Sequence, residues 1–171
     1  MRALNNLITR LYRSVALAFA GVCLMAAPVA ASCLETGLML EHTQIRATAP
    51  NAPVSAGYLQ ITNMTGQTQT LVSAAAPFSQ TAEIHDMKHE NGVMKMHQID
   101  GGLVLPDGLT VALQPKGRHL MFMGLDRQLK PEQSYQITLT FTPCGDVTMP
   151  FLVVTTPGQH KAHKHSHSHN H

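Results

Sequence analysis

Histidine and methionine side chains occur together in two short stretches, residues 83–96 and 119–121. The first contains Asn-Gly at 91–92, a dipeptide that strongly favours a two-residue β-hairpin turn. Side chains two positions apart on a strand point to the same face, so each stretch gathers imidazoles and thioethers on one face. The residues that this pattern brings together are His85, Met87, His89, Met94 and Met96 in the hairpin, and His119 and Met121 in the second stretch.

The donor types indicate a metal. Thioethers are soft ligands that suit Cu(I), whereas zinc sites use thiolate, imidazole or carboxylate. In the register set by Asn-Gly, His85 lies diagonally across from Met96, within reach of one shared atom. Packing in a small β domain is the alternative interpretation for any single one of these methionines. Their concentration beside histidines favours a copper site.

The order of the donors resembles the motif of a known family. A histidine, ten residues, a methionine, a gap and then His-x-Met is similar to the motif of the PCu(A)C family of periplasmic copper chaperones, and the match covers about residues 36 to 155. The gap is one residue longer than is usual in that family, an insertion that a turn can absorb. The resemblance implies His85, Met96, His119 and Met121 as Cu(I) ligands, with Met87 as a further candidate.

Residues 1–31 have the pattern of a secretory signal peptide. Three arginines precede a nearly uninterrupted apolar run at 14–27, and small residues precede the expected cleavage site. The run is shorter than the roughly 20 residues that span a bilayer. We therefore expect export to the periplasm. A lipid anchor at Cys33 is the alternative, although the residues before Cys33 fit a lipidation signal poorly.

The exported part contains one predicted domain, residues 33–156, which is long enough to bury a core. It holds two cysteines, Cys33 and Cys144. An even number of cysteines in an exported protein favours a disulfide. Two free thiols, or a lipidated Cys33, remain open as alternatives.

Short segments of alternating apolar and polar residues, separated by turn residues, predict an all-β fold. Seven to nine such strands and no convincing helix are typical of a β-sandwich. The family resemblance implies the cupredoxin-like Greek-key form of it. Outside the hairpin, the expected strands cover residues 39–46, 57–63, 70–74, 110–113, 118–124, 134–141 and 147–154.

Residues 157–171 form a histidine-rich tail with almost no apolar side chain. Such a segment cannot bury a core, so we expect it to be disordered and to bind metal. Imidazole is a good ligand for Cu(II). An expression tag is the competing explanation, but the irregular spacing favours a natural tail. The predicted Cu(II) ligands are His160, His163, His165, His167, His169 and His171.

Several function classes lack support in the sequence. The segment from Cys33 to Gln159 has a net charge of −3, with no basic patch suited to nucleic acid. A blue-copper site needs a thiolate beside two histidines, and no histidine lies near Cys144 in the sequence. Because motifs of thiol-redox enzymes and serine hydrolases are also absent from the sequence, we expect no enzyme.

Together, the residues and the resemblance predict a periplasmic copper chaperone. The resemblance implies delivery to the dinuclear copper centre of cytochrome c oxidase subunit II, with a thiol-disulfide copper chaperone as a further partner. Copper sequestration without delivery is the alternative, and a copper redox enzyme is a more remote one. Contact with a membrane is expected only through a partner or through the lipid anchor considered above.

Overall fold

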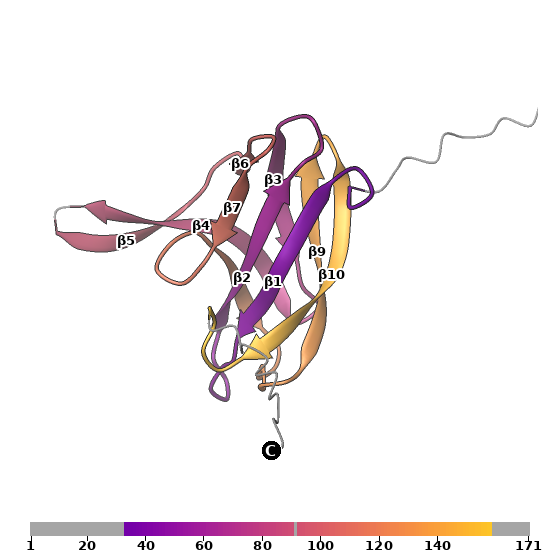
Figure 1. The fold of residues 1–171 in the computed structure, drawn as a ribbon. Helices are drawn as coiled ribbons and strands as arrows, with labels where there is room; N and C mark the ends of the chain where they lie inside the picture. Colours follow the sequence, from indigo (N-terminus) through magenta and orange to yellow (C-terminus); the bar gives the residue numbers. More distant parts are fainter. Residues whose placement is uncertain (1–32, 91, 159–171) are drawn as a thin grey trace, which may run out of the picture. The chain divides into compact units, whose positions relative to one another are not determined.

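The computed structural model describes residues 33–90 and 92–158. This part of the chain forms ten strands and no helix, and therefore no helix that could span a membrane. The strands are β1 (Leu38–Arg46), β2 (Val54–Asn63), β3 (Gln69–Ala75), β4 (Ser79–Glu90), β5 (Val93–Gln98), β6 (Leu103–Leu105), β7 (Thr110–Leu113), β8 (His119–Leu125), β9 (Ser134–Thr142) and β10 (Gly145–Val154) (Figure 1). The predicted signal segment and the tail histidines lie outside the described residues.

Alternation of side chains along the strands builds the core. In β9 the residues Ile137, Leu139 and Phe141 are buried, whereas their neighbours are exposed or half-buried. This is the period of two that a half-buried strand requires. The core also contains Phe78, whose ring packs edge-on against that of Phe122 at 5.2 Å between centroids. Side chains of β4 and β8 belong to the same apolar cluster as those of β3 and β6, which lie toward the other end of the sheet.

Hydrogen bonds join the strands into one open sheet in the order β5-β4-β8-β2-β1-β10-β9-β3-β6, with β7 also paired to β2. Strands β1 and β10 are parallel, and the other pairs are antiparallel. The all-β prediction is confirmed, while the Greek-key cupredoxin-like topology stays a prediction. The expected seven to nine strands were too few, because the three residues of β6 are too short for alternation to reveal a strand.

Cys33 and Cys144 are joined by a disulfide that links the segment before β1 to the turn between β9 and β10. Cys33 is fully buried. Because its sulfur is already bonded to another sulfur, the structure leaves no thiol at Cys33 for a lipid anchor. The disulfide therefore ties the chain before β1 to the turn between β9 and β10 by a covalent bond.

The predicted register of the hairpin is confirmed: Glu90 pairs with Val93, His89 with Met94, and Met87 with Met96. Gly92 has a φ of +82°, a conformation that glycine adopts without a steric penalty. The pairing of β4 with β8 ends at His85 opposite His119. Beyond that point β4 and β5 continue as a two-stranded projection, residues 86–90 and 92–97, which we call the hairpin arm (Figure 1).

Candidate metal site

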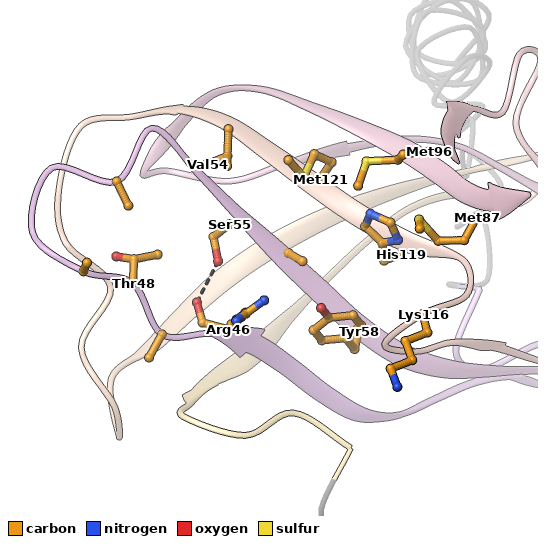
Figure 2. Close-up of a pocket in the computed structure, with 14 residues that line it drawn as sticks. Arg46, Thr48, Val54, Ser55, Tyr58, Met87, Met96, Lys116, His119 and Met121 are labelled. Atoms are coloured by element: carbon orange, nitrogen blue, oxygen red, sulfur yellow. Dashed lines mark hydrogen bonds between the residues drawn. The ribbon is translucent and has the colours of Figure 1, made fainter. Parts of the chain in front are cut away.

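A groove of about 490 Å³ lies beside β2 and β8, at the base of the hairpin arm. Small side chains from residues 47–56 line part of it, and imidazole and thioether groups line another part (Figure 2). In β8 the period of two turns Leu120 and Phe122 into the core. The donors that the groove brings together are Met87, Met96, His119 and Met121.

A contact with the backbone fixes the ring of His119 and leaves one of its nitrogens without a proton. Its side chain is buried, with 6% of the residue exposed, and its Nδ1 lies 2.9 Å from the carbonyl oxygen of Gly117. A carbonyl can only accept a hydrogen bond, so Nδ1 carries the proton and donates it. This fixes the tautomer and leaves the lone pair on Nε2 for coordination. The Tyr58 ring, from β2, lies beside the His119 ring, with 6.5 Å between the ring centroids.

His85 pairs directly with His119 across β4 and β8, and the centroids of the two rings lie 5.8 Å apart. The Nε2 atom of His85 lies 2.7 Å from Oε2 of Glu83. An ionised carboxylate can only accept, so Nε2 donates and the lone pair lies on Nδ1. That Nδ1 is buried and has no hydrogen-bond partner within the described residues.

An unpartnered buried lone pair is costly, and a metal ion would satisfy it. Two bonds of about 2 Å from imidazole nitrogens to one ion fit between rings at the spacing of His85 and His119. His85 does not itself line the groove. The structure therefore places it beside the groove donors, one strand away from His119.

The methionines surround His119 from two directions. Met121 comes from β8, two residues after His119, whereas Met87 and Met96 come from the hairpin, as a directly opposed pair (Figure 2). Met96 is 46% exposed, so core packing does not account for its side chain. Met87 is only a further candidate in the prediction from sequence, but the structure places it in the groove beside Met96.

Sequence reasoning missed four groups around the donors. Glu83 could have been found, because it lies two residues before His85 on the same face of β4. Tyr58 could not have been found, since its place beside His119 depends on strand order. Burial raises the pKa of the Tyr58 hydroxyl, and the positive charge of Arg46 partly offsets this rise. Arg46 and Lys116 add two positive charges to the lining of the groove.

Oxygen-rich and thiolate sites are not formed in this part of the chain. Within residues 33–90 and 92–158, no three His, Cys, Asp or Glu side chains are placed to hold a metal ion. The groove itself contains one imidazole and three thioethers, with the His85 imidazole beside it, and thioethers with imidazole are a combination that suits a soft ion.

Comparison with known proteins gives three kinds of similarity. The model of the LpqE-like family, described as "Putative lipoprotein LpqE-like", matches residues 38–153. "Putative lipoprotein Lxx21020" of Leifsonia xyli subsp. xyli (strain CTCB07) is 28% identical over 139 residues, which cover 78% of this chain and 84% of that protein.

Among solved structures, the solution structure of CuI-DR1885 from Deinococcus radiodurans has a TM-score of 0.57 and 29% identity, covering 71% of this chain and 80% of that one. The apo PCuAC domain from PmoF1 has a TM-score of 0.59 and 21% identity, covering 70% of this chain and 94% of that one. The copper-bound PCuAC domain from PmoF2 has a TM-score of 0.58 and 18% identity, covering 70% and 93%.

Proposed function

Because the chain belongs to the LpqE-like family and has the fold of PCuAC domains, we propose that it is an exported copper chaperone of the periplasm. It binds Cu(I) through His85, Met96, His119 and Met121, with Met87 as a further donor. The observation that carries this proposal is the meeting of imidazole and thioether groups from three strands at one groove. The similarity to a protein solved in its Cu(I) form supports the choice of metal.

The donor set suits binding followed by release. Thioethers are neutral, so Cu(I) leaves them without any proton transfer, and each bond is individually weak. The half-exposed Met96 is the donor that a partner reaches first. Copper then leaves by ligand exchange, in which the partner's donors replace the thioethers one at a time. The two imidazoles, fixed by Gly117 and Glu83, hold the ion until the last step.

The proposed recipient is the dinuclear copper centre of cytochrome c oxidase subunit II, with a thiol-disulfide copper chaperone as a second partner. The resemblance to the PCu(A)C motif supports this choice. Sequestration without delivery uses the same ligands and differs only in whether copper leaves for a partner. Catalysis is not proposed, because four protein donors leave no open position of the kind that catalytic metals keep.

A Cu(I) titration of the full mature chain against a competing chelator, followed by X-ray absorption at the copper edge, tests the site. We expect one tight equivalent with a mixed nitrogen and sulfur shell at a copper-to-protein ratio of one. A shell of nitrogen alone would contradict the proposal, because it would place the metal on histidines without the methionines.

The histidine tail is proposed to hold Cu(II) and to raise the local copper concentration near the groove. Truncation at Pro157 is therefore expected to remove at least one bound equivalent of Cu(II) while leaving the Cu(I) affinity of the groove unchanged. Equilibrium dialysis with Cu(II) measures the first quantity, and chelator competition the second. An unchanged Cu(II) stoichiometry would exclude this role for the tail.

A further inference from the structure

The hairpin arm has two chemically distinct faces. The register of β4 and β5 places sulfur and imidazole on one of them, which we call the soft face, and charged groups on the other. On the charged face Glu90 lies 3.3 Å from the Lys95 ammonium and 3.0 Å from the His97 ring. The soft face consists of Met87, His89, Met94 and Met96.

The soft face has no core to fill. In the described part of the chain, no third strand pairs with the hairpin arm. Met94 is 47% exposed, Met96 is nearly as exposed, and His89 is also exposed. The register puts these side chains next to one another, and a contiguous exposed patch of this kind is typical of an interaction site.

His89 and Met94 are directly opposed, which places their Cβ atoms about 5 Å apart. At that spacing an imidazole nitrogen and a thioether sulfur reach a common ion. The next pair on the same face is Met87 and Met96, about 7 Å closer to the groove along the strands. Soft donors therefore follow one another from the tip of the arm to His119 without interruption.

We propose that His89 and Met94 form a second, outer site for a soft monovalent ion, from which the ion passes to the groove through Met87 and Met96. In each step a new bond from copper to a thioether forms as an older one breaks. Copper stays in the +1 state, and no proton moves, because the thioethers and the neutral imidazole are uncharged. The outer site rests on the proposed function only for the identity of the bound ion, Cu(I). The geometry of His89 and Met94 does not depend on that function.

Ag(I) is a suitable probe, since it is a soft monovalent ion that does not change oxidation state in air. The full mature chain, labelled with ¹³C in the methionine methyl groups, is titrated with Ag(I) and followed by NMR. The tail histidines carry no such label, so Ag(I) that binds to the tail does not itself shift any observed methyl signal. We expect the Met96 and Met121 methyl signals to move during the first equivalent and the Met94 signal during the second. Met39 and Met64, which are 49% and 59% exposed, serve as internal controls.

The variant His89→Ala separates the two sites. It is expected to weaken the response of Met94 to Ag(I) at least tenfold and to leave the responses of Met96 and Met121 unchanged. Lys88→Ala, on the charged face, is the matched control and is expected to change neither. Because both side chains are exposed, neither variant threatens the fold.

The outcomes for the two proposals are distinguishable. A Met94 signal that moves no more than those of Met39 and Met64 would overturn the outer site and leave the groove standing. A Met94 signal that moves while Met96 and Met121 do not would support the outer site and overturn the proposed function. If the Met94 signal still responds to Ag(I) in His89→Ala, then His89 is not a ligand of the outer site, and the proposed site is wrong.

Discussion

Replacing both Met96 and Met121 by leucine is expected to weaken Cu(I) binding by at least about 100-fold, because loss of even outer-shell partners of a metal typically costs 10- to 100-fold in affinity. Leucine has nearly the volume of methionine, so the packing changes little. Met96 is half-exposed, and Met121 is only partly buried. The fold is therefore expected to survive, and competition with a Cu(I) chelator reports the loss of the donors alone.

The double variant Met39→Leu with Met64→Leu is the matched control. Both side chains are as exposed as Met96, and neither lines the groove. Its Cu(I) affinity is expected to equal that of the unmodified protein. If Met96→Leu with Met121→Leu also binds Cu(I) with unchanged affinity, the thioethers are not ligands, and the proposed site is wrong.

Removal of the disulfide by Cys33→Ser with Cys144→Ser is expected to lower the free energy of unfolding by about 4 to 5 kcal/mol. The two cysteines are separated by 111 positions in the sequence, and a loop of that length restricts the unfolded chain strongly. This is a large share of the roughly 5 to 15 kcal/mol that stabilises a typical domain. Urea denaturation of the variant and of the oxidised protein measures the difference.

The same variant is expected to keep its Cu(I) affinity wherever it remains folded. The disulfide lies before the start of β1, whereas Arg46 at the end of β1 lines the groove. The nine residues of this strand separate the two by about 30 Å. Reducing the unmodified protein is the control and is expected to cause the same loss of stability. A loss of less than about 1 kcal/mol would contradict the chain-entropy argument.

The register of the hairpin could be predicted because its causes are local. Asn-Gly sets the turn, and the period of two then determines that His89 meets Met94 and Met87 meets Met96. The same period puts His119 and Met121 on one face of β8. These rules act over a few residues and need no knowledge of the rest of the fold.

The sequence by itself thus determined the hairpin register and most strands, and it predicted the donors and their preference for copper. Only the tertiary structure decided which strand lies beside which. The pairing of β4 with β8 puts His85 opposite His119, and the pairing of β8 with β2 brings Tyr58 beside His119. The disulfide was favoured by the sequence, but only the fold brings Cys33 beside Cys144 and decides against free thiols. Strand order depends on burying apolar faces contributed by distant segments, and no rule of local spacing contains that information.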